Sequence, residues 1–591
     1  MPAIVARHAP SALTERLAAE GLHPVLARIY AARGVASARE LSPDLSGLAA
    51  PGAMLNLTRM ADLLADAIAA DQRLLIVGDY DADGATACAV GVRALRSFGA
   101  HVEYFVPNRF EYGYGLTPEI ARLARERFQP ELLVTVDNGI SSIEGVEECN
   151  RLGIKVLVTD HHLPGPRLPA AACIINPNQG GCAFPSKHLA GVGVMFYLMA
   201  ALRAELRSRG RFGPDSPPAS PTLLPEGEGS FEPAAGRNNG MGPNLADLLP
   251  LVALGTIADV VPLDHNNRVL VEQGLQRIRA GRIQPGLDAL FRVAGRDARR
   301  ASTRDLAFAV APRLNAAGRL TDMALGIECL ITEDPARALH IAGELDRLNH
   351  ERRAIELNMQ DEALAAVEAT EYSESYTLSL FNPAWHQGVI GILAGRMKDR
   401  FHRPTFAFAR ADSGELRGSG RSIAGLHLRD ALERVSVRHP GLIARFGGHA
   451  AAAGLTLREA ALARFRDAFE EAARGMLSPA DLERVIETDG ELADADCCLE
   501  LATILEDVPW GQGFPRPSFH GSFDVVSRRV VGERHLRLRL ARAGRPLDAM
   551  LFGATAPLPE RIDAVYRLDA NEYQGQRGLR LIIEHWNAAS G

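Results

Sequence analysis

Long hydrophobic runs and paired cysteines are both missing from this sequence. The longest apolar run, near residues 189–202, is shorter than a membrane-spanning helix needs. Residues 1–10 lack the basic and then apolar layout of a signal peptide. The seven cysteines are scattered and form no C-x-x-C pair, which argues against a disulfide framework and against a zinc ribbon. We therefore expect a cytoplasmic protein with no membrane partner.

A positive net charge is also missing. The formal charge of −7 at pH 7 is opposite in sign to that of most proteins that bind nucleic acid over a broad surface. A polyanionic partner would therefore have to be bound by local basic surfaces. The chain of 591 residues is long enough for three or four domains, and its composition is that of a globular protein.

The first half of the chain has the alternating pattern of a parallel α/β sheet. Helix signals separate four apolar segments of strand length. These segments are 73–78, 101–106, 131–136 and 154–159. We predict a doubly wound sheet with helices on both faces.

Acidic and imidazole side chains follow three of these four segments. They are Asp79, Asp81 and Asp83 after the first, Asp137 after the third, and Asp160, His161 and His162 after the fourth. In an open parallel sheet the loops at the carboxyl ends of neighbouring strands meet at one edge. Carboxylates gathered there repel one another unless they are solvated or share a cation. Because three clusters converge, a metal site is favoured over a set of acidic turns.

A further aspartate, Asp259, follows the apolar helical pattern at 245–257. A carboxylate in such an apolar setting must be paired or bind a metal ion. We therefore add Asp259 to the candidate ligands.

Glycine, arginine and histidine recur later in patterns that suit phosphate binding. We expect a turn at 312–319 and glycine-rich loops at 418–422 and 446–449, where backbone N–H groups can approach an anion closely. The candidate side chains and glycines are Arg313, Asn315, Arg319, His386, Arg421, Ser422, Gly447, Gly448 and His449. Each pattern alone is equally compatible with an ordinary surface loop, but two glycine-rich segments in one domain favour a phosphate-binding face.

The C-terminal part reads as short strands and turns, in which Arg537 and Arg539 alternate with leucines to give one basic face. A small β-barrel with such a face suits a polynucleotide backbone. Aromatic residues nearby offer either stacking surfaces or a core; they are Phe514, Phe519, Phe523, Tyr566 and Tyr573.

The predicted domain organisation follows from these patterns. It comprises an N-terminal helical extension (1–70), an α/β catalytic domain (71–334) with a flexible insertion (211–243), a long connecting helix (335–370), a second α/β domain (371–480) and an OB-like β-barrel (481–591).

Four motifs closely resemble those of the DHH phosphoesterase superfamily in order and spacing. They are Val77–Gly84, Val136–Gly139, Asp160–His162 and Gly255–Asp259. The segments around Arg319, Arg421 and His449 resemble further motifs of its single-strand DNA exonuclease branch, including the DHHA1 domain. The resemblance implies a 5′-to-3′ exonuclease that degrades single-stranded DNA to mononucleotides in recombination and repair. It also implies a single-strand-binding protein and a helicase as partners, and we expect a monomer.

The same resemblance implies roles for the acidic and imidazole residues. Two divalent metal ions would be held by Asp81, Asp83, Asp137, His161 and Asp259, with Asp137 bridging them. Asp79 and Asp160 would support these ligands, and His162 would face the scissile phosphate. Some members of the superfamily have a histidine where this chain has Val77, which leaves the first metal ion one ligand poorer. Oxygen ligands suit Mg²⁺, and the imidazole of His161 shifts the preference toward Mn²⁺.

Two alternatives share these motifs. A DHH phosphodiesterase of short oligonucleotides or cyclic dinucleotides would not need the basic C-terminal domain. A catalytically silent relative that serves as a replication scaffold would have no reason to keep every carboxylate and His161.

Overall fold

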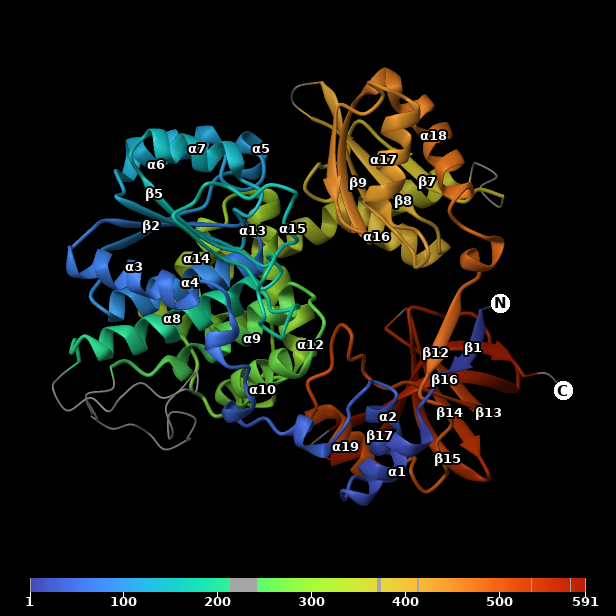
Figure 1. Ribbon diagram of the computed structural model, residues 1–591. Coiled ribbons are helices and arrows are strands. Elements are labelled where there is room, and N and C mark those ends of the chain that lie inside the picture. The colour runs from blue at the N-terminus through green and yellow to red at the C-terminus, as the bar shows by residue number, and fades with distance from the viewer. Residues whose placement is uncertain are drawn as a thin grey trace. The chain divides into compact units, whose positions relative to one another are not determined.

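The computed structural model describes residues 2–212, 242–368, 374–411, 414–532, 534–573 and 576–589 (Figure 1). The described chain divides into two compact units, Met1–Val5 with Leu348–Glu487 and Ala6–Arg347 with Thr488–Gly591. Most of the predicted insertion at 211–243 lies outside the described residues. Within the described ranges, no helix is both long enough and apolar enough to cross a membrane.

The larger unit contains the predicted parallel sheet, in the order β3-β2-β4-β5-β6. Its strands are β2 (Leu74–Gly78), β3 (Val102–Phe105), β4 (Leu132–Val136), β5 (Lys155–Thr159) and β6 (Cys173–Ile175). The four predicted strands are confirmed, and β6 is an addition. The register pairs Gly78 with Val136 and Val136 with Thr159, so the carboxyl ends of β2, β4 and β5 lie at the same level.

Helices cover both faces of this sheet, as predicted (Figure 1). One face carries α6 (Pro118–Phe128) and α7 (Ile143–Arg151), packed on a core that includes Leu75 and Leu133. The other face carries α3 (Leu57–Ala69), α4 (Ala82–Ser97) and α8 (Gly191–Ser208). The start of α4 follows the end of β2 directly, which places the aspartates of this loop at the sheet edge.

A group of further helices completes the catalytic region. They are α9 (Leu249–Ala258), α10 (His265–Arg279), α11 (Pro285–Val293), α12 (Thr303–Asp305), a π-helical turn (Leu306–Val310), α13 (Ala311–Leu320), α14 (Ala324–Ile331) and α15 (Pro335–Glu368). The long helix predicted at 335–370 is confirmed as α15. The turn predicted at 312–319 is wrong, because this segment is helix α13, whose first turn accommodates Pro312.

The N-terminal segment contains the predicted helices α1 (Ser11–Ala19) and α2 (Pro24–Ala31), but it begins with strand β1 (Ala3–Ala6). This strand pairs with β12 (Val485–Thr488), far away in the sequence. Such a pairing leaves no local signal, so the purely helical extension that we predicted for 1–70 is incomplete.

The smaller unit is the predicted second α/β domain, with the sheet order β10-β11-β9-β8-β7. Its elements are β7 (Leu378–Phe381), α16 (Ile390–Phe401), β8 (Thr405–Arg410), β9 (Glu415–Arg421), α17 (Leu428–Arg438), β10 (Arg445–Gly448), β11 (Ala452–Arg458) and α18 (Leu462–Arg474).

The glycine-rich loops predicted in this domain are mainly strands. Gly418 and Gly420 lie in β9, where a Cβ atom would come within 2.4 Å of the Phe408 ring and 2.5 Å of the Phe406 ring. These two glycines therefore make room for aromatic core residues. Gly447 and Gly448 are the last two residues of strand β10. The segments 418–422 and 446–449 are therefore mainly strand, and the prediction of two glycine-rich loops is wrong.

The C-terminal part forms a closed barrel in the order β13-β14-β15-β17-β16, which confirms the OB-like prediction. Its elements are helix α19 (Leu499–Asp507) and strands β13 (Phe519–Val531), β14 (His535–Arg542), β15 (Arg545–Phe552), β16 (Arg561–Tyr573) and β17 (Gln576–Ala588). Phe514, Phe519, Phe523 and Tyr566 are all buried, so these four aromatic residues are core and not stacking surfaces.

Candidate metal centre

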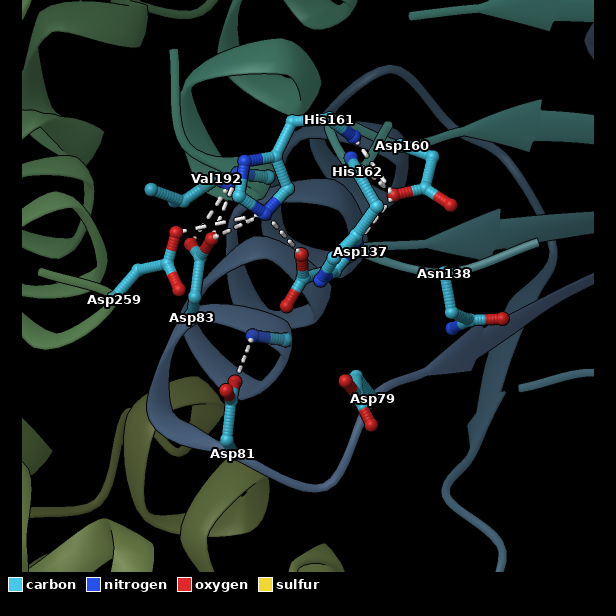
Figure 2. Close-up of polar contacts among 12 residues, drawn as sticks. Asp79, Asp81, Asp83, Asp137, Asn138, Asp160, His161, His162, Val192 and Asp259 are labelled. Carbon is cyan, nitrogen blue, oxygen red and sulfur yellow. Dashed lines mark hydrogen bonds and ion pairs between the residues drawn. The ribbon is translucent and has the colours of Figure 1, made fainter. Parts of the chain in front are cut away.

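Carboxylates and one imidazole converge at the carboxyl ends of β2, β4 and β5 (Figure 2). Two groups of ligand atoms, each within 4.8 Å of one another, involve residues from separate segments. The first group is Asp83, His161 and Asp259, and the second is Asp79, Asp81 and Asp137. Asp137 also lies in a third group with His161 and His162, so it stands between the other two.

The first group contains polar atoms that are buried without a matching donor or acceptor. The Nε2 atom of His161 lies 3.0 Å from Asp137 Oδ1, 3.5 Å from Asp259 Oδ2 and 3.9 Å from Asp83 Oδ2. Among the described residues, Nε2 of His161 and the nearest oxygens of Asp137 and Asp259 make no well-formed hydrogen bond. Buried polar atoms normally have partners. One imidazole nitrogen facing several carboxylate oxygens is a donor set that fits a divalent cation.

Asp83 is fixed by the amino end of helix α8. Its Oδ2 accepts a hydrogen bond from the backbone N–H of Gly191 at 2.7 Å, and its Oδ1 accepts one from Val192 at 2.9 Å. Unpaired N–H groups at a helix start favour an anionic partner. The sequence prediction did not include Gly191 and Val192, although the Gly-Val-Gly start of an apolar helix is a recognisable signal for anion binding.

The second group is held by its own loop. The side chain of Asp81 caps helix α4 by accepting a hydrogen bond from Gly84 N–H at 3.0 Å, and Oδ1 of Asp79 accepts one from Tyr80 N–H at 2.7 Å. Asp79 thus lies among candidate ligands and not behind them. With Asp79 the second group has three carboxylates. The third carboxylate could replace the imidazole ligand that a histidine at the position of Val77 would supply.

Asn138 ties together the two strands that carry the second group. Its amide nitrogen donates to the carbonyl oxygens of Val136 at 2.9 Å and Val77 at 3.2 Å. The preceding residue, Asp137, has a φ of 61°, a conformation that few residues other than glycine adopt. The two hydrogen bonds of Asn138 therefore help to hold the backbone of Asp137 in this uncommon conformation.

His162 is paired with the buried Asp160 at 2.8 Å between Nδ1 and Oδ1. Burial opposes the charged form of His162, but the hydrogen bond that its Nδ1–H donates to Asp160 outweighs burial and raises the pKa of the imidazole to about 9. Burial acts against ionisation of Asp160 too, yet its hydrogen bonds from His162 and Ile140 hold the pKa of this carboxyl below its ordinary value. His162 is therefore a cationic side chain beside the centre.

Without a metal ion the carboxyl groups of the centre resist ionisation. Burial, reinforced by the neighbouring Asp259, raises the pKa of Asp83 to about 7. Burial and the charge of Asp81 raise the pKa of Asp259 to about 7, and burial with Asp83 holds the pKa of Asp137 well above its usual range. Burial lowers the pKa of His161, which keeps its imidazole neutral. A divalent cation would relieve the repulsion among these carboxylates, and the neutral imidazole could serve as one of its ligands.

Two of the three candidate phosphate ligands on α13 serve the protein itself. Arg313 is buried, forms an ion pair with Asp346 at 2.7 Å and donates to the carbonyl of Ala309. Asn315 accepts a hydrogen bond from Ala82 N–H at 2.9 Å, at the start of α4. Arg319 lies in the last turn of this helix. Helix α13 thus supports the loop that carries Asp79 and Asp81.

Two candidates of the smaller unit, Arg421 and His449, lie at the same end of its sheet. Arg421 pairs in register with Ala452, whose carbonyl accepts from His449 N–H at 2.8 Å. A Cβ atom on Gly391, near the start of α16, would lie 3.1 Å from Arg421 Nη2. Burial lowers the pKa of Arg421, and no acid pairs with it in the part of the chain that the structure describes. The guanidinium donates to Ser419 Oγ and to the carbonyl of Gly420 but has no carboxylate partner among the described residues, which favours an anionic ligand.

The other candidates of this unit differ in availability. The hydroxyl of Ser422 donates to the carbonyl of Leu426 at 2.8 Å and is buried. His386 accepts from Gly388 N–H at 3.1 Å, and burial lowers its pKa. Gly447 and Gly448 contribute backbone only. Arg421 is thus the strongest candidate for an anion ligand in this set.

Arg537 and Arg539 point outward from β14, in alternation with buried leucines, as predicted. Both lie near the same carboxylate, Asp548, at 3.4 and 2.8 Å. Because one carboxylate lies near two guanidinium groups, Arg537, Arg539 and Asp548 together carry a net positive charge.

The sequence matches three domain families. These are the N-terminal domain of the DHH family over residues 73–217, the DHHA1 domain over 373–475 and the RecJ OB domain over 488–585. The chain is 50% identical to the single-stranded-DNA-specific exonuclease RecJ of Dickeya dadantii, over 98% of both chains. It is 48% identical to that of Escherichia coli, over 95% of this chain and 96% of the relative.

The fold is similar to that of crystal structures of RecJ from Thermus thermophilus. The structure in complex with Mn²⁺ aligns with a TM-score of 0.78 at 28% identity, over 100% of this chain and 80% of the other. The structure in complex with Mg²⁺ aligns with a TM-score of 0.72 at 27% identity, over 100% and 78%.

Proposed function

This chain belongs to the RecJ family of single-stranded-DNA-specific exonucleases, and from this premise we propose that it is a metal-dependent hydrolase that releases 5′-mononucleotides from the 5′ end of single-stranded DNA. The observation that carries the proposal is the set of buried, unsatisfied oxygens around His161 Nε2. A chain that had lost catalysis would have no reason to keep buried carboxylates in mutual repulsion.

The geometry supports a ligand assignment with Asp137 shared between two divalent ions. One ion would be held by Asp83, His161 and Asp259, and the other by Asp79 and Asp81. Such ions, when bound, supply a nucleophilic water and stabilise the charge of the leaving oxygen. This assignment makes Asp79 a ligand, where the resemblance alone implied a supporting role. We propose Mn²⁺ as the preferred ion and Mg²⁺ as an alternative, because imidazole takes part.

His162 and Arg421 are the side chains proposed to contact the strand. His162 carries a positive charge beside the centre, supported by its hydrogen bond to Asp160, and it would donate to an oxygen of the scissile phosphate. Arg421 would bind another phosphate, and His449 and His386 of the same domain are further candidates for phosphate contacts. Arg537 and Arg539 would track the backbone of the same strand. Arg313, by contrast, is engaged within the protein and would act on the strand only through α13.

The wider setting follows from the same premise. We propose a cytoplasmic monomer that acts in DNA recombination and repair, on strands that a helicase exposes and a single-strand-binding protein covers. The proposed 5′-to-3′ direction rests on the resemblance of the motifs.

The test is digestion of a long single strand that carries a label at either its 5′ or its 3′ end, with Mn²⁺ present. We expect labelled mononucleotide at once from the 5′-labelled strand and only late from the 3′-labelled one, and almost none from a blunt duplex. Activity confined to very short oligonucleotides or cyclic dinucleotides would favour the phosphodiesterase alternative. Strand binding without any release by the wild-type protein would favour the silent scaffold.

A further inference from the structure

The loop that follows Asp259 holds an uncommon backbone conformation. Val260 has a φ of 62°, and its side chain is 63% exposed. A β-branched residue rarely adopts this left-handed region, because its Cβ substituents crowd the backbone. Burial of the valine side chain does not explain the conformation, so the surrounding contacts must impose it.

Both ends of this loop are fixed. On one side, Asp259 N–H donates to Gly255 O at 2.9 Å and so remains attached to helix α9. On the other side, Leu263 N–H donates to the carbonyl of Gln512 at 2.7 Å. Gln512 belongs to the C-terminal part of the chain, just before the barrel begins. The metal ligand Asp259 therefore lies a few residues from a contact with another domain.

The partner segment is a tight turn, Gly511–Phe514, that approaches the loop too closely for side chains. The N–H of Gly511 donates to Phe514 O at 2.9 Å, and the N–H of Phe514 donates back at 3.1 Å. A Cβ atom on Gly511 would lie 2.7 Å from Leu263 Cδ1, and one on Gly513 would lie 3.1 Å from Pro262 Cβ. We call Gly511–Phe514 the brace turn.

The brace turn is itself held in place by residues from the N-terminal part of the larger unit. The Arg268 guanidinium lies 4.5 Å from the centre of the Phe514 ring, and Tyr30 stacks on Trp510 and Phe514 at 6.1 and 6.0 Å. Since Arg268 lies in α10, soon after the loop, the same stretch of chain contacts both the backbone of the turn and its phenylalanine ring. The turn can thus transmit the position of the C-terminal domain to the loop.

We propose that the brace turn is a positioning element for the metal centre: by packing on Pro262 and Leu263 it holds Val260 in its left-handed conformation and so fixes the direction of the Asp259 carboxylate. Asp259 is the only acidic member of its group that comes from outside the sheet edge and the β2–α4 loop. Its backbone is attached to α9 on one side and continues into the loop on the other, and Oδ2 of its carboxylate has no hydrogen-bond partner among the described residues, whereas the Asp83 carboxylate has two N–H donors of α8. The C-terminal domain thereby completes the centre as well as contacting the strand. This inference rests on the proposed metal-dependent function.

The experiment measures Mn²⁺ binding to full-length, metal-free protein by titration calorimetry, without DNA. Gly511→Ala is compared with Gly578→Ala, because the latter glycine has no atom within 4 Å of an added Cβ. Gly513→Ala is compared with Gly532→Ala, since both glycines have positive φ, 68° and 58°, but only Gly513 faces the loop. The second pair separates loss of the contact from backbone strain.

We expect Gly511→Ala and Gly513→Ala to raise the Mn²⁺ dissociation constant about tenfold, as changes to groups that orient ligands typically do, while their controls stay within about twofold of wild type. Thermal midpoints in EDTA should fall for both Gly513→Ala and Gly532→Ala, because both backbones have positive φ. The rate of strand digestion by the two brace variants should recover at saturating Mn²⁺, which a general loss of folding would not permit.

Equal Mn²⁺ dissociation constants for a brace variant and its control overturn the inference. If circular dichroism shows that Gly511→Ala does not fold, the comparison of Gly513→Ala with Gly532→Ala decides the question. A wild-type protein that binds Mn²⁺ but releases no nucleotide would refute the proposed function, while the binding comparison would still judge the brace turn.

Discussion

Replacement of Gly318 by alanine is a sharp test of how helix α13 supports the metal loop. An ideal Cβ on Gly318 would lie 1.9 Å from the carbonyl oxygen of Tyr80 and 3.1 Å from Met323 Cε. Tyr80 stands between Asp79 and Asp81, so a displacement of its carbonyl moves both carboxylates. The side chain of Met323 can adjust, but the backbone of the loop cannot do so without moving the centre.

The size of the effect follows from these distances. An unstrained carbon–oxygen contact is about 3.3 Å, so the helix or the loop must shift by more than 1 Å. A misplacement of about 1 Å in a catalytic site costs roughly 100-fold in rate. Overpacking costs about 1–3 kcal/mol of stability, and the better helix propensity of alanine offsets about 1 kcal/mol of it. We therefore expect a fold that survives with a nuclease that is about 100-fold slower.

The assay is release of mononucleotide from 5′-labelled single-stranded DNA, together with Mn²⁺ titration and thermal unfolding. Gly343→Ala is the matched control, because this glycine also lies within a helix but has nothing within 4 Å of an added Cβ. The control should keep full activity and gain up to about 1 kcal/mol. A Gly318→Ala protein with wild-type rate and Mn²⁺ affinity would refute the supporting role of α13.

Three further predictions address the charges of the protein. Because burial raises the pKa of Asp83 and Asp259 to about 7, above the value of about 4 in an unfolded chain, the stability of the metal-free protein should fall as pH rises from 5.5 to 8. The rise in thermal midpoint on adding Mn²⁺ should then be larger at pH 8 than at pH 5.5, and a pH-independent rise would contradict this. Half-maximal digestion should need less Mn²⁺ than Mg²⁺, and coincident titration curves would count against an imidazole ligand. Joint replacement of Arg537 and Arg539 by Gln should weaken single-strand binding and reduce the number of ions released on binding, read from the salt dependence of the binding constant, by up to about two. Asp548→Asn should strengthen binding. Unchanged salt dependence in the double variant would show that this face does not contact the strand.

The sheet edge and its acidic residues could be predicted because their signals are local. The strand ends that carry Asp79 and Asp137 are visible as apolar runs that stop at a carboxylate, and parallel topology brings such ends together. The closed barrel and helix α15 were likewise predictable from periodicity. Within helix α15 and within each strand of the barrel, the residues that set the period are neighbours in the sequence, whereas closure of the barrel depends on the distant pairing of β13 with β16.

The errors arose where a residue responds to a distant partner. Gly418 and Gly420 resemble a phosphate-binding loop until the rings of Phe406 and Phe408 are seen against them. The sequence around Arg313 suggests a phosphate ligand and gives no sign of its ion pair with Asp346 on α15, which helps to hold helix α13 in place. The sequence around a glycine or an arginine shows which roles the residue could have. Only the contacts in the folded structure show which of these roles it has.

The backbone donors to Asp83 are functional groups that a sequence pattern does not reveal. Gly191 and Val192 act through their N–H groups, which every residue except proline possesses. Their side chains therefore carry no chemical signal, and only the helix start hints at an anion. The position of Asp79 among the candidate ligands also needed the structure, since it depends on where the loop turns and not on residue type.

The measurement that tests the central claim most directly is the number of Mn²⁺ ions bound at saturation by the wild-type protein and by Asp137→Asn, with release of mononucleotide from a 5′-labelled single strand measured on the same samples. Since Asp137 stands between both groups of ligands, we predict two ions in the wild type, at most one weakly bound ion in the variant, and loss of release with strand binding retained. A variant that still binds two ions and still releases nucleotide would contradict the account.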